Sequence, residues 1–80
     1  MKLWIGNLDP QATDDELRAF IGKYTKLEIT GVERHPGDGS RPAVMLELAG
    51  SDIVALGEAQ RRLHGMYWKL RPLHVAIPSR

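Results

Sequence analysis

Apolar residues recur along this chain with two spacings, every second residue in some segments and every third or fourth residue in others. In the first segment Leu3 and Ile5 fall on one side. The opposite side carries Lys2, Trp4 and Gly6. This period of two is that of a half-buried strand. The chain is therefore predicted to begin with a β-strand whose outer face carries an indole.

A helix is predicted to begin after Thr13, because Thr13 and Glu16 have the spacing of a capping box. Asp14 and Asp15 suit the positive end of a helix dipole. Apolar residues then follow at helical spacing, namely Leu17, Phe20, Ile21 and Tyr24. This stripe indicates a helix of about three turns that packs against the sheet.

Two further strands are predicted around a turn. The segment from Leu27 to Arg34 is rich in Ile, Thr and Val, and residues 36–40 form a Pro-Gly-Asp-Gly-Ser turn. The next segment, residues 43–48, alternates again. Its apolar side carries Val44, Leu46 and Leu48, and its mixed side continues from Arg41 through Ala43, Met45 and Glu47. We expect these two strands to pair.

A second helix is predicted after Ser51 or Asp52, either of which could cap it. Its expected buried stripe is Ala55, Leu56, Ala59 and Leu63. Gly65 stands where a left-handed residue ends a helix. A last strand alternates through Leu73, Val75 and Ile77, with His74 and Ala76 on its other face, and Pro78 ends it.

The order β-α-β-β-α-β has a consequence for the fold. Two right-handed crossovers place both helices on one face of one antiparallel sheet. The predicted fold is therefore α+β, a ferredoxin-like sandwich with strand order 4-1-3-2. Strands one and three become central neighbours, so Trp4 and the row Arg41, Ala43 and Met45 should meet on the uncovered face, flanked by His74. Such an open face is a candidate binding platform.

Composition narrows the classes of function. Eighty residues indicate one domain over residues 1–80, and the net charge of +1 does not by itself favour a polyanionic partner. The chain has no cysteine, which excludes thiolate chemistry and Cys-based metal sites. No segment resembles a signal peptide or a membrane span. We expect an intracellular protein, with the cytoplasm favoured, that does not associate with a membrane.

The residues Leu3-Trp4-Ile5-Gly6-Asn7-Leu8 resemble the six-residue ribonucleoprotein motif of the RNA-recognition-motif family. Leu63-His64-Gly65 is similar to the Leu-Asn-Gly that closes the family's second helix. The second family motif corresponds to residues 41–48, where Arg41 keeps the basic position. Ala43 and Met45 stand where the family has two stacking rings, so this motif is degenerate.

The resemblance implies a module that binds single-stranded RNA, with single-stranded DNA as a second ligand. Trp4 would stack on a base, and Lys2 and Arg41 would contact phosphates. The full set of expected contacts is Lys2, Trp4, Asn7, Arg41, Ala43, Met45, His74 and Arg80. For Asn7, a bond to the backbone at the strand end is an equal alternative. Because two rings are missing, we expect weak binding.

Other aromatic and imidazole residues are expected to be structural. Tyr67 and Trp68 lie where the family often has a short hairpin, and burial at the sheet edge is the favoured interpretation. His35 and His64 are interpreted as loop and helix-end residues. No pair of histidines has the spacing of a metal site, so we expect no metal and no cofactor.

Proteins of other functional classes share this order of elements. A small acyl-phosphate hydrolase would need a basic loop after strand one, and residues 6–12 contain neither Arg nor Lys. A copper carrier would need paired cysteines there. The main alternative is a protein-binding relative that uses its helix side or Trp68. We expect a monomer that has no catalytic activity and no small-molecule substrate. We also expect a small stand-alone protein of bacterial type, and the alternative is a domain excised from a longer protein.

Overall fold

The computed structural model describes residues 1–50 and 52–78. In chain order these residues form β1 (Lys2–Gly6), α1 (Asp14–Tyr24), β2 (Ile29–His35), β3 (Ala43–Leu48), α2 (Ile53–Leu63), β4 (Tyr67–Trp68), β5 (Arg71–Pro72) and β6 (His74–Ala76). Four of the strands form one antiparallel sheet in the order β2-β3-β1-β6. With only these four strands numbered, this is the predicted order 4-1-3-2.

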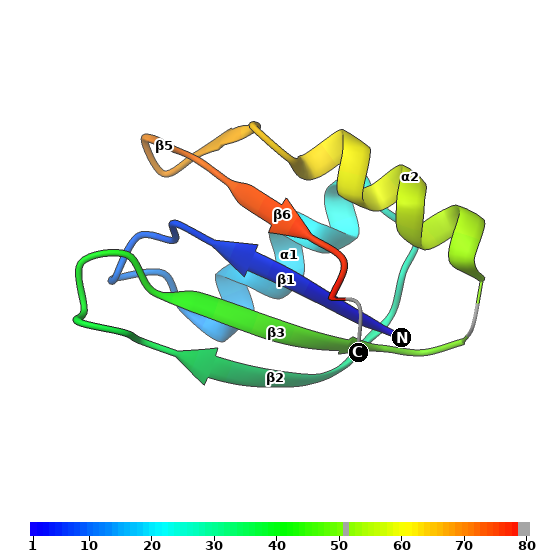
Figure 1. The fold of residues 1–80 in the computed structure, drawn as a ribbon, viewed down its shortest axis with the longest axis horizontal. Helices are drawn as coiled ribbons and strands as arrows, with labels where there is room; N and C mark the ends of the chain where they lie inside the picture. The colour runs from blue at the N-terminus through cyan, green and yellow to red at the C-terminus, as the bar shows by residue number, and fades with distance from the viewer. Residues whose placement is uncertain (51, 79–80) are drawn as a thin grey trace.

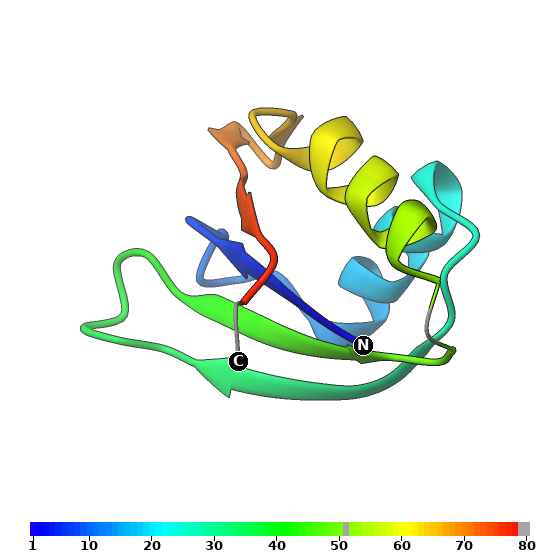
Figure 2. The ribbon, with the colours of Figure 1, turned by 45° about the vertical axis from the view of Figure 1, so that its right-hand side comes forward.

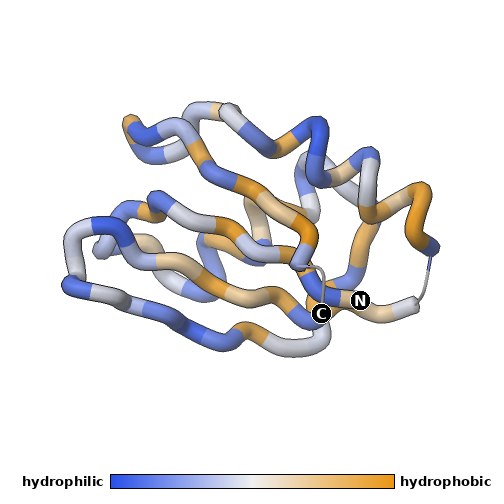
Figure 3. Tube along the Cα trace, in the orientation of Figure 1, coloured by the Kyte–Doolittle hydropathy of each residue, from blue (hydrophilic) through white to orange (hydrophobic). Residues whose placement is uncertain are grey.

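Figures 1 and 2 show both helices on the same side of the sheet. The predicted ferredoxin-like α+β fold is therefore confirmed. The core lies between the sheet and the helices, and its largest fully buried side chains are Leu3, Ile5, Leu8, Leu17, Ile21, Leu46, Leu63, Leu73, Val44 and Val75. Strand β3 is largely hydrophobic, whereas the second half of β2 and the loop after it are mostly hydrophilic (Figure 3).

Helix α1 begins as its sequence predicts. The Glu16 N–H donates to Thr13 Oγ1 at 3.1 Å, and the Thr13 N–H donates to a Glu16 carboxylate oxygen at 3.0 Å. These bonds satisfy two amides that the helix leaves free. Leu17, Phe20 and Ile21 are buried, and Tyr24 is partly buried against the core. The predicted stripe thus packs on the sheet.

Helix α2 is capped by Asp52, whose carboxylate accepts from the Ala55 N–H at 3.1 Å. The other candidate cap, Ser51, lies outside the described residues. Leu56, Ala59 and Leu63 are buried as predicted, whereas Ala55 is only half-buried. Gly65 has a φ of 82°, the left-handed conformation expected after a helix.

Two strand boundaries differ from the predictions. Strand β2 begins at Ile29 rather than Leu27, because the Thr25 hydroxyl closes helix α1 and accepts from the Leu27 N–H at 3.3 Å. The pairing of β2 with β3 then shifts between Ile29 and Gly31. At the other end of the chain, β6 stops at Ala76, and the apolar Ile77 is exposed instead of continuing the strand.

A hairpin of β4 and β5 precedes β6 and is held against helix α1. The Trp68 ring stacks on Phe20 with centroids 4.7 Å apart, so this indole is partly buried against the core. Tyr67 was expected to be buried as well, but 70% of it is exposed. Neighbouring residues of a strand face opposite sides, so only one of the two rings reaches the core.

Within residues 1–50 and 52–78, no helix is long and apolar enough to cross a membrane.

Replacing Thr13 with Ala should destabilise the fold by about 1 kcal/mol, because the first turn of α1 loses its side-chain acceptor. The free energy of unfolding from urea denaturation measures this. Gln11→Ala is the control, since the exposed Gln11 side chain makes no hydrogen bond among the described residues. Equal stability of Thr13→Ala and wild type would contradict a role for this cap.

Candidate functional site

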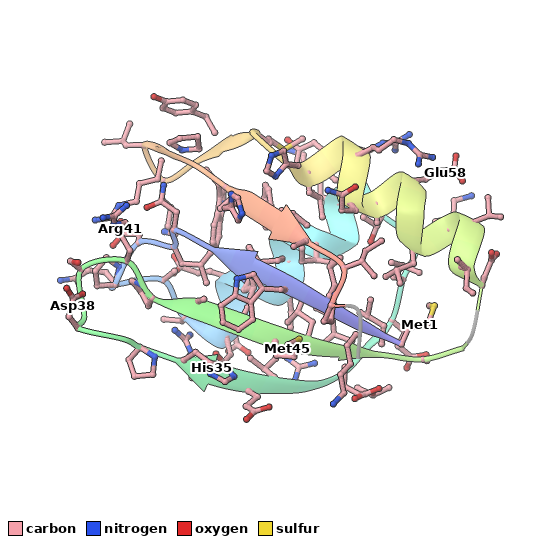
Figure 4. All side chains as sticks on the ribbon, viewed as in Figure 1. Met1, His35, Asp38, Arg41, Met45 and Glu58 are labelled. Carbon is pink, nitrogen blue, oxygen red and sulfur yellow. The ribbon has the colours of Figure 1, made fainter. Side chains whose placement is uncertain are left out.

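Trp4 lies in the middle of the uncovered sheet face. In the strand register Trp4 is opposite Met45 on β3 and opposite Ala76 on β6. The same face carries Lys2 and Gly6 from β1, since alternate residues of a strand share a face. In Figure 4, Met45 lies over the strands on the side turned to the viewer, away from the helix behind them.

The Trp4 indole lies close over its own strand. Its Nε1 is 3.3 Å from the position that a Cβ on Gly6 would occupy. Ala43 is beneath the same region, with only 6% of its surface exposed. Trp4 itself is half-buried. Small residues at positions 6 and 43 thus let the indole lie low on the sheet while part of the ring stays accessible.

His35 is a member of this face that the sequence interpretation assigned to a loop. It is the last residue of β2, and its ring centroid is 5.1 Å from that of Trp4, with the planes tilted by 55°. Its Nε2 lies 3.6 Å from a carboxylate oxygen of Glu33. In Figure 4 His35 lies on the same side of the sheet as Met45. The imidazole therefore supports one side of the indole.

A shallow groove of about 610 Å³ runs from Trp4 toward the β4–β5 hairpin. It brings together five of the predicted contact residues, Trp4, Asn7, Arg41, Ala43 and His74. The rest of its lining is Gly6, His64, Gly65, Pro72 and Leu73. Lys2 and Met45 lie on the sheet outside this groove, and Arg80 lies outside the described residues.

Asn7 makes the backbone contact that was one of its two expected roles. Its side-chain Nδ2 donates to the carbonyl oxygen of Pro72 at 2.9 Å. Its φ of 59° is left-handed, a conformation that Asn tolerates better than most residues. The amide therefore ties the end of β1 to the hairpin along one wall of the groove.

Several basic residues near the C-terminal end of the chain are engaged in internal contacts. Arg71 Nη1 donates to the carbonyl oxygens of Leu8 and Ser40 at 2.9 and 2.7 Å. The Arg62 guanidinium donates to the Tyr24 carbonyl oxygen at 3.2 Å. Arg71 thus joins two loops, and Arg62 joins the ends of the two helices. These internal contacts make both guanidinium groups less available to an external phosphate.

Lys2 and Arg41 are different, because within residues 1–50 and 52–78 their side chains make no hydrogen bond or ion pair. Arg41 belongs to the β2–β3 loop, at one end of the sheet (Figure 4). Lys2 is opposite Glu47 in the strand register, and Glu33 shares the same face. Glu47 and Glu33 therefore offset the charge of Lys2. Asp38 lies near Arg41, and hydrogen bonds from Ser40 and, to a lesser extent, the charge of Arg41 lower the pKa of the Asp38 carboxyl. Arg41 lines the groove, whereas Lys2 does not.

The helix side has few free charges for the alternative function, which is binding of a partner protein. Arg34 bonds the Asp14 carboxylate at 2.6 Å, and Lys69 bonds Glu16 at 2.9 Å. The Lys69 ammonium, together with the Thr13 N–H, lowers the pKa of Glu16 below its usual value. The acidic first turn of α1 is thus largely neutralised by the protein's own cations.

A second hollow of about 780 Å³ lies between the end of α1 and one side of α2. Its lining includes Lys23, Tyr24, Lys26, Asp52 and Arg62. None of the expected contact residues lines it.

Over the described part of the chain, no group of three or more His, Cys, Asp or Glu side chains is placed to hold a metal ion.

Comparison with known proteins finds a relative that covers nearly the whole chain. No family model matches the chain. Over 78 residues, 98% of its length, the chain is 28% identical to polyadenylate-binding protein 2 of Arabidopsis thaliana. It spans only 12% of that protein's length. The similarity agrees with the relationship to RNA-recognition-motif proteins that Leu3–Leu8 suggests, and it concerns one segment of a much longer relative.

Replacing Gly6 with Ala should displace the Trp4 indole, because the added methyl would lie 3.3 Å from Nε1. At this distance the indole must move by a few tenths of an ångström, and the half-buried ring on the open face has room to do so. The indole N–H resonance of Trp4 should therefore shift. Gly22→Ala is the control, since nothing lies within 4 Å of the added methyl and Ala favours α1. An unmoved indole resonance in Gly6→Ala would contradict the packing described here.

Proposed function

We propose that this chain is a binding module for single-stranded RNA that uses the uncovered face of its sheet. The observation that carries the proposal is the half-buried Trp4 indole, held low on the central strand beside a groove that contains Arg41. An accessible ring of this kind suits a splayed base, and the guanidinium suits the neighbouring phosphate.

Each expected contact residue receives a role in this proposal. Trp4 stacks on a base, and Met45 and His74 extend the platform with a polarisable thioether and a flat ring. Arg41 and Lys2 contact phosphates. Ala43 forms the floor beneath the indole, Asn7 forms a wall of the groove, and Arg80 is a further candidate for phosphate contact.

Polyadenylate is the ligand named for the similar Arabidopsis protein. We therefore propose adenine-rich single strands as the first ligands to test. Stacking alone is tolerant of base identity, because every base presents a π-face. Oligouridylate and the corresponding DNA strands are accordingly the comparison ligands.

We expect the affinity of the isolated module to be low. Each stacked base contributes about 1–3 kcal/mol, and the chain has Ala43 and Met45 at two positions where the family has rings. The absence of two stacked bases reduces the binding free energy by on the order of 2–6 kcal/mol, unless neighbouring contacts compensate. His35 already packs beside Trp4, so it adds support rather than a second free platform.

Titration of the labelled protein with hexaadenylate RNA should shift backbone amides on the open face. The shifts should cluster at residues 2–7 and 41–47 and at His74. Shifts confined to α1 and α2 would overturn the proposal. Such a pattern would favour the alternative function, in which the module binds a partner protein through its helix side.

Trp4→Ala should weaken binding of hexaadenylate about tenfold or more, because one stacked base is lost. The variant should still unfold cooperatively, since Trp4 lies outside the core cluster. Leu70→Ala is the matched control, because Leu70 is 90% exposed on the hairpin and does not line the groove. Fluorescence anisotropy of labelled RNA measures both. Equal affinities of the two variants would contradict stacking on Trp4.

Salt dependence tests the charge contacts separately. With Lys2, Arg41 and Arg80 as the contacts, log affinity should fall against log salt with a slope of about −2. Arg41→Gln should reduce this slope by about 0.7, the value for one phosphate contact on a single strand. Arg61→Gln on the exposed side of α2 should leave it unchanged. A slope several times steeper in the wild type would mean that the cations have been assigned wrongly.

A further inference from the structure

The outer edge of the sheet at β6 is covered by two side chains of helix α2. The Gln60 side chain donates from Nε2 to the Val75 carbonyl oxygen at 3.0 Å. The Val75 N–H in turn donates to Nδ1 of His64 at 3.0 Å. Gln60 and His64 are four residues apart, so both reach the same strand from one side of the helix. Together they satisfy the polar groups that an edge strand leaves open.

The contact with Val75 fixes the tautomer of His64. A ring nitrogen that accepts a hydrogen bond carries no proton, so the neutral imidazole must carry its proton on Nε2. That N–H has no partner among residues 1–50 and 52–78. The ring also meets His74 edge to face, with centroids 5.1 Å apart and planes at 71°. The position of the His64 ring and the direction of its Nε2–H donor are therefore both set before any ligand binds.

His64 lines the same groove as Trp4, Arg41 and His74, although it belongs to the end of a helix and not to the sheet. We infer that His64 is a base-reading residue, which donates its Nε2–H to a ring nitrogen or carbonyl oxygen of a nucleobase seated in this groove. The inference rests on the proposed function. Arg41 supplies the charge that a phosphate needs, and a neutral N–H donor of fixed direction suits the uncharged edge of a base.

If the role of His64 were purely structural, the residue would only cover the edge of β6 and would not affect RNA binding. Gln60 gives the matched comparison, because it makes the other hydrogen bond to the Val75 backbone but does not line the groove. His64→Leu and Gln60→Leu each remove one bond to the same residue. Both variants should therefore lower the midpoint of urea denaturation by similar amounts, and only the first should change the binding of RNA.

The experiment compares the affinities of the wild type and these two variants for hexaadenylate and hexauridylate RNA. His64→Leu should weaken binding of the preferred hexamer about fivefold to tenfold, as expected for one lost hydrogen bond. Gln60→Leu should change it less than twofold. Equal losses in both variants, or no loss in His64→Leu, would overturn the inference.

A second measurement uses the unmodified protein, so it does not depend on the folding of a variant. Imidazole nitrogen resonances of the free protein should show His64 protonated on Nε2 with Nδ1 as an acceptor. Addition of the preferred hexamer should shift the Nε2–H signal and slow its exchange with water. If the hexamers shift the sheet amides but leave this signal unchanged, only the inference on His64 fails. If they shift no amides at all, the proposed function fails with it.

Discussion

The structure depends on one constraint, which is that both helices pack on the same face of a four-stranded sheet. This arrangement provides a single core and leaves the other face without a covering layer. The middle of that face is stabilised instead by cross-strand packing around Trp4. Met45 and His35 surround the indole, and Gly6 and Ala43 give it room to lie low. The same packing that completes the sheet therefore also presents an aromatic surface to solvent.

The distribution of charge follows from the need to fix the loops that surround this face. Arg71 joins the loop after β1 to the loop before β3, and Arg34 joins β2 to the start of α1. These contacts use cations that a count of charges would assign to a ligand. Arg41 remains at the groove, and this is where the proposed function assigns a phosphate contact.

Much of the fold could be predicted from sequence, because alternation and helical spacing record which side of each element is buried. The capping box at Thr13 and the outward position of Trp4 follow from such local patterns. Contacts between distant residues could not be predicted in this way. Asn7 bonds Pro72, and His35 joins the face because β2 continues to the residue opposite Ala43. Tyr67 and Trp68 are adjacent, and only the tertiary structure determines which ring packs on Phe20.

The central claim is that the Trp4 indole contacts a base directly. Nuclear Overhauser effects between the indole protons and the base protons of bound hexaadenylate test it most directly. The account predicts strong effects from the Trp4 ring and weaker ones from Met45, with none from the Trp68 ring that packs on Phe20. A complex in which the RNA protons show effects only to residues of α1 and α2 would contradict it.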